Sequence, residues 1–120
     1  TGFIIYTSGS TGNQKGAVVS REAAIDNAKS VGMLHGFHNS RHATCLPMYH
    51  CNAIMMSLLG CFLYDSPLLI QAYPNMKSYL KSVSKFGAKT ASIAPPLLTK
   101  LLSEYKGSLP DCLEYFISAS

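Results

Sequence analysis

The sequence predicts an α/β fold in which a mostly parallel sheet is flanked by helices on both faces. Short apolar segments typical of buried strands alternate along the 120 residues with longer segments whose apolar residues recur every three or four positions. Hydrophobic residues make up 48% of the chain and charged residues 13%, a balance that indicates a globular chain rather than a disordered one. We therefore expect a packed unit in which most strands are buried.

The first half of the chain is expected to place two strands around a polar loop, the first of them buried, and then to alternate helix, strand and helix. Ser20 is a suitable N-cap for the first helix and Gly36 would end it, while Pro47 closes the third strand. The second helix is apolar along its length, so we expect it to be buried on most sides. In order, these elements are strand 2–6, strand 17–19, helix 21–34, strand 43–46 and helix 52–63.

The second half repeats the alternation. Asn75 is a suitable N-cap for a helix that Gly87 stops, and Pro95-Pro96 opens another helix, since proline is well tolerated in a first helical turn. These signals complete the pattern that predicts parallel strands joined by helices. In order, the elements are strand 68–70, helix 76–86, strand 90–94, a helix from 95 and strand 113–117.

Length, charge and cysteine content restrict the class of protein. A chain of 120 residues is short for an enzyme that handles two substrates, and both ends look cut, so we expect part of a larger domain. The net charge of +4 comes from scattered lysines, which argues against a nucleic-acid partner, and no apolar stretch is long enough to span a membrane. The four cysteines include no CxxC pair, and three of them lie in apolar surroundings, which favours reduced core cysteines and a cytoplasmic location.

The segment with the clearest chemistry is 6–16, YTSGSTGNQKG. Its glycines permit positive φ and let backbone amides approach an anion; they are Gly9, Gly12 and Gly16. Hydroxyl donors for phosphate oxygens are dense; they are Thr7, Ser8, Ser10 and Thr11. Lys15 adds a positive charge at the far end, and the preceding strand anchors the donors. The order of residues fits neither GxxxxGK[ST] nor GxGxxG, and a plain Ser/Gly turn between strands is the alternative.

Segment 6–16 resembles the phosphate-binding signature of the adenylate-forming superfamily, which includes acyl-CoA synthetases, luciferases and the adenylation domains of peptide synthetases. Ten of its eleven residues fit; the exception is Gln14, where the family usually has proline. Losing that proline should leave the phosphate contacts intact but loosen the loop. The resemblance implies that ATP is bound by Thr7, Ser8, Gly9, Ser10, Thr11, Gly12 and Lys15.

A second segment, 46–53 with the sequence LPMYHCNA, resembles the Pro-x-aromatic-His motif of the same family in its acyl-CoA synthetase form. The resemblance implies a carboxylate pocket formed by Tyr49, His50 and Asn52. His50 is the candidate catalytic residue, with a positioning and electrostatic role, because adenylation mainly requires stabilisation of phosphate charge. The alternative is that the His50 side chain merely caps the helix that begins near Asn52.

Two further features have competing interpretations. Segment 94–98, APPLL, resembles a helix start near the family's acyl pocket, although its leucine spacing also suits an ordinary core helix. His38 and His42 stand four apart, but no Cys or carboxylate lies at a familiar ligand spacing. We therefore expect His35, His38 and His42 to be solvent-exposed and to bind no metal.

By resemblance, the parent protein joins a small carboxylic acid to AMP with release of pyrophosphate and then transfers the acyl group to coenzyme A. The implied cofactors are ATP and Mg²⁺, with coenzyme A as co-substrate. We expect the chain to be a fragment of the large N-terminal AMP-binding domain, without the C-terminal domain and inactive alone. The alternatives are a non-catalytic nucleotide- or phosphate-binding module and a structural fragment without a ligand.

Overall fold

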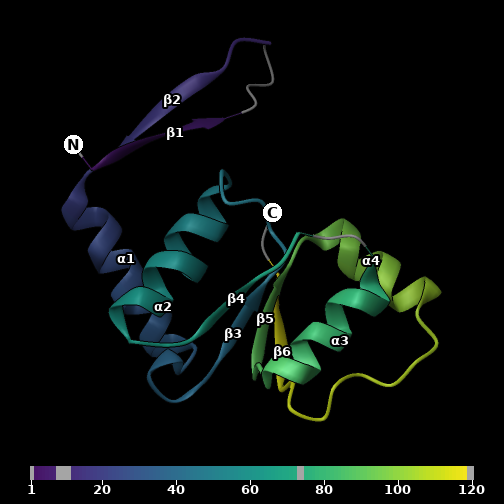
Figure 1. Cartoon of the computed structure of the whole chain (residues 1–120). Helices are drawn as coiled ribbons and strands as arrows, with labels where there is room; N and C mark the ends of the chain where they lie inside the picture. The colour runs from purple at the N-terminus through teal and green to yellow at the C-terminus, as the bar shows by residue number, and fades with distance from the viewer. Residues whose placement is uncertain (1, 8–11, 73–74, 119–120) are drawn as a thin grey trace.

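A parallel sheet forms the centre of the computed structural model, which describes residues 2–7, 12–72 and 75–118 (Figure 1). Within these residues the sheet has four strands in the order β4-β3-β5-β6. His42 in β3 pairs with Leu68 in β4 and Thr90 in β5, and Thr90 pairs with Tyr115 in β6. The strands are β3 (His42–Thr44), β4 (Leu68–Ile70), β5 (Thr90–Ile93) and β6 (Tyr115–Ser118). The predicted parallel sheet is confirmed.

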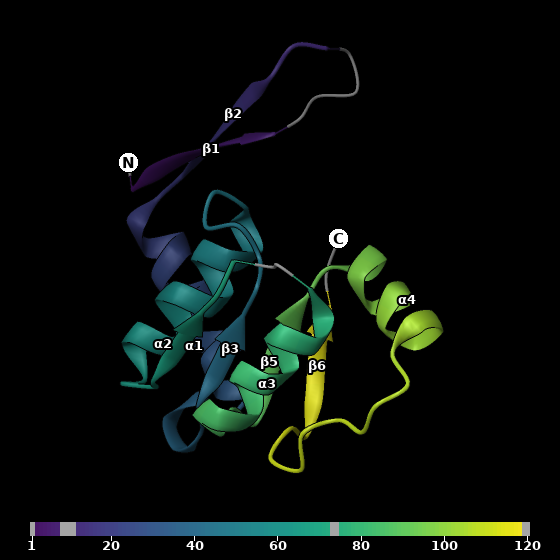
Figure 2. The ribbon, with the colours of Figure 1, turned by 45° about the vertical axis from the view of Figure 1, so that its right-hand side comes forward.

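Helices cover both faces of this sheet, as the sequence predicts (Figures 1 and 2). One face packs on α3 (Met76–Phe86) and α4 (Pro95–Glu104), because alternate strand residues such as Ala43, Ala91 and Ile93 point towards them. The opposite face packs on α1 (Arg21–Leu34), the short 3₁₀ helix η1 (Phe37–Asn39), η2 (Asn52–Leu58) and α2 (Leu59–Leu63). The sheet is thus the middle layer of three.

The helix ends follow the predicted capping residues. Ser20 accepts a hydrogen bond from the Ala23 amide, and the Asn75 side chain accepts one from the Ser78 amide at 2.8 Å. Gly87 ends α3 in the left-handed conformation, with φ of 72°, where a side chain would be strained. These local hydrogen bonds explain why α1 and α3 have the bounds that the sequence indicates.

The predicted helix 52–63 differs from the expectation in two ways. Its first part, η2, is a π-helix, in which Leu59 donates to the Ile54 carbonyl five residues back. It is also buried on one side only, since Phe62 is 80% exposed. A continuous run of apolar residues shows no helical periodicity, so the sequence reveals neither the wider π-helical turn nor which face of the helix is exposed.

The first two strands form a separate antiparallel hairpin, β1 (Phe3–Thr7) and β2 (Lys15–Val19), which stands away from the main sheet (Figures 1 and 2). The expectation that the first strand is buried is wrong for the described residues, because β1 pairs only with β2 and Tyr6 is 67% exposed. The hairpin holds the two ends of segment 6–16 together.

Side-chain contacts join the helices on the α1 side. The Tyr64 hydroxyl donates to the Lys29 carbonyl at 2.8 Å, and the Tyr64 ring lies against Gly32, where an added Cβ would be 2.3 Å from ring carbons. Gly32 is therefore needed for the close approach of Tyr64 to α1.

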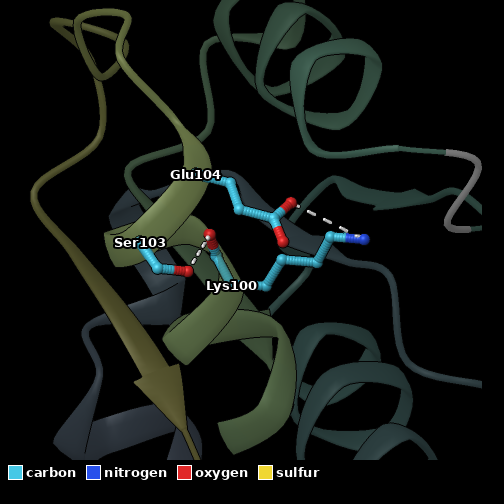
Figure 3. A network of polar contacts seen from close by, with 3 residues as sticks. All are labelled: Lys100, Ser103 and Glu104. Carbon is cyan, nitrogen blue, oxygen red and sulfur yellow. Dashed lines mark hydrogen bonds and ion pairs between the residues drawn. The ribbon is translucent and has the colours of Figure 1, made fainter.

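The α4 surface carries a small polar network (Figure 3). Lys100 Nζ lies 3.8 Å from a Glu104 carboxylate oxygen, and Ser103 Oγ donates to the Lys100 carbonyl at 3.3 Å. Both charged side chains are more than half exposed, so this pair contributes little to stability.

The cysteines are partly as expected. Cys45 and Cys61 are buried and free, as reduced core cysteines are, but Cys51 is exposed because it precedes the first turn of η2 at the surface. Burial raises the pKa of the Cys61 thiol to about 11. Among residues 2–7, 12–72 and 75–118, no helix has the length and hydropathy to cross a membrane.

Candidate active site

The hairpin and the start of η2 line a cavity of about 750 Å³. The hairpin contributes Thr7 and Gln14, from the two ends of the predicted phosphate loop, and the opposite wall contains Tyr49 and His50. The complete lining is Ile4, Ile5, Tyr6, Thr7, Gln14, Tyr49, His50, Cys51 and Ile54. The two segments singled out in the sequence therefore meet at one cavity.

The hairpin fixes both ends of the phosphate loop. Thr7 and Lys15 are directly paired, and the Thr7 hydroxyl donates to the Lys15 carbonyl at 3.4 Å. Gly12 has a φ of 82°, which favours glycine. Gly16 instead allows the Ile4 side chain to approach the backbone, because a Cβ at position 16 would lie 2.8 Å from that side chain. The predicted ligands Ser8, Gly9, Ser10 and Thr11 lie outside the described residues.

Tyr49 and His50 form the wall opposite the hairpin. Their ring centroids are 4.8 Å apart, and both side chains are exposed. The backbone holds them, because the His50 amide donates to the Pro47 carbonyl at 3.0 Å and the His50 carbonyl accepts from the Ile54 amide at 3.1 Å. His50 thus closes the first turn of η2 with its backbone carbonyl. No side-chain hydrogen bond caps η2 within the described residues.

Asn52 lies apart from its predicted partners. It is the first residue of η2, half-buried, and it does not line the 750 Å³ cavity. Its Oδ1 atom is buried and has no hydrogen-bond partner among the described residues. The structure therefore brings Tyr49 and His50 together with Thr7 at one cavity, whereas Asn52 is not among the residues that line it.

A second cavity of about 520 Å³ lies at the carboxyl ends of β3, β4 and β5. Ala94 and Leu97, from the predicted pocket segment, contribute to it, and its lining is mainly apolar. Carboxyl ends of parallel strands are where open α/β sheets bind ligands. The complete lining is Cys45, Leu46, Pro47, Met48, Ile70, Gln71, Ala72, Ala94 and Leu97.

Sequence reasoning missed Ile70, Gln71 and Ala72 as pocket residues. The signal was available, because these residues end or directly follow the strand 68–70, and such positions meet at one edge of a parallel sheet. Met48 belongs to this second cavity and Tyr49 to the first. The loop after β3 therefore separates the two cavities.

The expectation of three solvent-exposed histidines is wrong for His42 and holds for His38. His42 is fully buried because it lies in β3, and burial lowers its pKa to about 3, with a smaller effect from nearby His35. His35 is half-buried, its Nδ1 lies 3.2 Å from the Tyr115 hydroxyl, and burial lowers its pKa. The described residues contain no cluster of three His, Cys, Asp or Glu side chains suited to a metal ion.

The family model for AMP-binding enzymes matches residues 1–120. The chain belongs to the AMP-binding enzyme family. Membership agrees with the resemblance of segment 6–16 to the adenylate-forming signature.

Curated relatives of this AMP-binding chain are CoA ligases. It is 22% identical over 119 residues to sulfoacetate–CoA ligase of Cupriavidus necator, a match that covers 98% of the chain and 23% of the relative. It is 28% identical over 120 residues to 4-chlorobenzoate–CoA ligase of a Pseudomonas species, covering 95% of the chain and 22% of the relative. The chain thus spans about a quarter of the curated relatives it matches.

Solved structures share the fold of the AMP-binding chain. O-succinylbenzoate CoA synthetase of Bacillus subtilis, in complex with its acyl-adenylate intermediate, superposes with a TM-score of 0.84 at 20% identity, covering 98% of the chain and 30% of that structure. ATP-bound MatB of Rhodopseudomonas palustris superposes with a TM-score of 0.79 at 23% identity, covering 98% and 24%. These matches confirm the predicted α/β fold.

Proposed function

We propose that the protein containing this AMP-binding chain activates a small carboxylic acid with ATP and then transfers the acyl group to coenzyme A. The observation that carries the proposal is the 750 Å³ cavity, in which Thr7 and Gln14 of the phosphate loop face Tyr49 and His50. A reaction between a phosphate and a carboxylate needs both groups in one enclosed space. The CoA ligase activity of the curated relatives supports the same reaction.

In the first step a carboxylate oxygen attacks the α-phosphorus of ATP, a P–O bond forms to give the acyl-adenylate, and pyrophosphate leaves. The hydroxyl of Thr7 and the ammonium group of Lys15 would contact the phosphates from the hairpin. His50 would donate a hydrogen bond to the carboxylate and hold it in line, without accepting a proton. Mg²⁺ would neutralise phosphate charge when bound with ATP.

In the second step the thiol of coenzyme A loses its proton to solvent and its sulfur attacks the acyl carbonyl carbon. The thioester bond forms, the bond from that carbon to the phosphate oxygen breaks, and AMP leaves with the bonding electron pair. The apolar cavity between Met48, Ile70 and Leu97 adjoins the loop of Tyr49 and His50. It would hold an apolar part of the acid or of the thiol close to the reacting carboxyl group. This chain alone would not catalyse the reaction.

The test is ATP–pyrophosphate exchange by the full-length protein with short, medium, long and aromatic carboxylic acids and with amino acids. Acid-dependent exchange, followed by thioester formation when coenzyme A is added, is the expected result. Exchange that is strongest with amino acids would contradict the CoA ligase assignment. ATP binding without exchange for any acid would instead identify a non-catalytic nucleotide-binding module.

A further inference from the structure

A buried histidine outside both cavities has a hydrogen-bond network that the proposed reaction does not use. His42 Nδ1 lies 2.8 Å from Thr90 Oγ1, and His42 Nε2 lies 3.1 Å from Ser57 Oγ and 3.0 Å from Ser92 Oγ. The two serine hydroxyls are 3.2 Å apart. All four residues are 2% exposed or less, so water does not compete for these groups.

This imidazole connects the elements on either side of the Tyr49–His50 loop. His42 opens β3, the strand before the loop, and Ser57 lies in η2, the helix after it. The first turn of η2 is closed by the hydrogen bond from the Ile54 amide to the His50 carbonyl. A shift of η2 relative to β3 would therefore move His50 and Tyr49 directly.

The same network reaches the second cavity. Thr90 and Ser92 belong to β5, and β5 leads into Ala94, which lines the cavity of about 520 Å³. His42 thus fixes three elements that converge on the two candidate cavities. An apolar side chain at this position would leave three buried hydroxyls with fewer partners, which is costly inside a protein.

We propose that His42 is a positioning residue for the adenylation reaction, acting through the Nε2 contact to Ser57 that holds η2 and hence Tyr49 and His50 at the cavity. The inference rests on the proposed function, because the positioned residues matter only for chemistry at that cavity. It also makes a claim about the two ring nitrogens: Nε2 reaches η2 through Ser57 as well as β5 through Ser92, whereas Nδ1 reaches only β5 through Thr90. The Nε2 side therefore controls the loop.

The roles of the two ring nitrogens can be distinguished by a pair of conservative substitutions in the full-length protein. The side-chain amide of glutamine reaches about as far as Nε2, whereas that of asparagine reaches only as far as Nδ1. His42→Gln should therefore keep a hydrogen bond to Ser57, and His42→Asn should keep only the one to Thr90. Ser57→Ala removes the η2 side directly. Ser66→Ala is the matched control because its hydroxyl donates to the Ser40 carbonyl in a part-buried hydrogen bond before the start of β3, whereas the Tyr49–His50 loop follows the end of β3.

In pyrophosphate exchange, His42→Asn and Ser57→Ala should lower kcat about 10-fold, because small displacements of positioning groups cost rate strongly. His42→Gln should stay within about 3-fold and Ser66→Ala within about 2-fold of the unmodified protein. The KM for ATP should be unchanged in all four, since the phosphate loop sits on the separate hairpin. Equal kcat values for the Asn and Gln variants, or for Ser57→Ala and Ser66→Ala, would overturn the proposal.

A second measurement keeps failure of this inference distinct from failure of the proposed function. Hydrogen exchange of the Ile54 amide reports the hydrogen bond to His50 without any substrate. Faster exchange in His42→Asn and Ser57→Ala than in His42→Gln supports the positioning role even if the unmodified protein shows no pyrophosphate exchange. Equal exchange rates in all variants would reject it.

Discussion

The ring centroids of Tyr49 and His50 lie 4.8 Å apart, at an interplanar angle of 39°, on the wall of the cavity opposite Thr7. Because backbone hydrogen bonds to Pro47 and Ile54 hold His50, its imidazole is available to a ligand. This geometry gives the AMP-binding chain a polar, partly aromatic wall facing its phosphate loop.

Replacing His50 separates hydrogen bonding from proton transfer. In the full-length protein, His50→Ala should lower kcat for pyrophosphate exchange about 100-fold, the usual effect of removing one donor from a developing charge. His50→Gln should recover most of that loss, because glutamine donates a hydrogen bond but cannot take up a proton. Rates should be measured from about pH 5 to about pH 8, the range in which histidine side chains in general can change charge. A pH profile that flattens in the glutamine variant would show that His50 acts as a base.

Removing the charge of Lys15 tests the hairpin side. Lys15→Gln should raise the KM for ATP about 10-fold while leaving the KM for the acid unchanged, since a charged donor to phosphate contributes roughly 1.5–3 kcal/mol. The matched control is Lys100→Gln on α4, where the lysine pairs with Glu104 at the surface (Figure 3). If the two variants raised the KM for ATP equally, net charge rather than the loop would be responsible.

Local signals in the sequence predict the helices well, because capping depends on neighbours in the chain. Ser20, Asn75 and Gly87 mark helix ends through contacts within one turn. The burial of His42 depends instead on its hydrogen bonds with Ser57, Thr90 and Ser92, residues distant in the sequence that come close only in the folded protein. A histidine next to a polar loop is more often exposed, so sequence reasoning placed it in water.

In the candidate site, too, local sequence signals are predictable and contacts between distant segments are not. The chemistry of segment 6–16 is readable from its residue types, and its family follows from their order. That Thr7 and His50 share a cavity depends on the direction in which the hairpin leaves α1, which no local pattern encodes. Similarly, the position of Gln71 beside Met48 requires the pairing of β3 with β4.

Gly32 is predicted to be sensitive to a single added methyl group. Gly32→Ala places a Cβ 2.3 Å from the Tyr64 ring, so the ring or the helix must move. Overpacking of this kind costs about 1–3 kcal/mol, against a gain of about 1 kcal/mol in helix propensity. Urea unfolding of the chain should therefore show a net loss of stability. Adding Tyr64→Leu should make the alanine neutral or favourable; an undiminished cost would show that Tyr64 is not the obstacle.

The burial of His42 predicts an acid-sensitive stability. Its pKa is about 3 in the folded chain and near 6.5 when unfolded, so between these values the unfolded state binds more protons. The contribution of neutral His42 to the free energy of unfolding should therefore be fully present above pH 6.5. Below that pH the free energy of unfolding should fall, by up to about 1.4 kcal/mol per pH unit. Urea unfolding between about pH 5 and 6.5 avoids most carboxylate titration. His42→Gln should remove most of this slope and His35→Gln only a smaller part, since His35 is half-buried; an equal slope in the His42 variant would place the responsible group elsewhere.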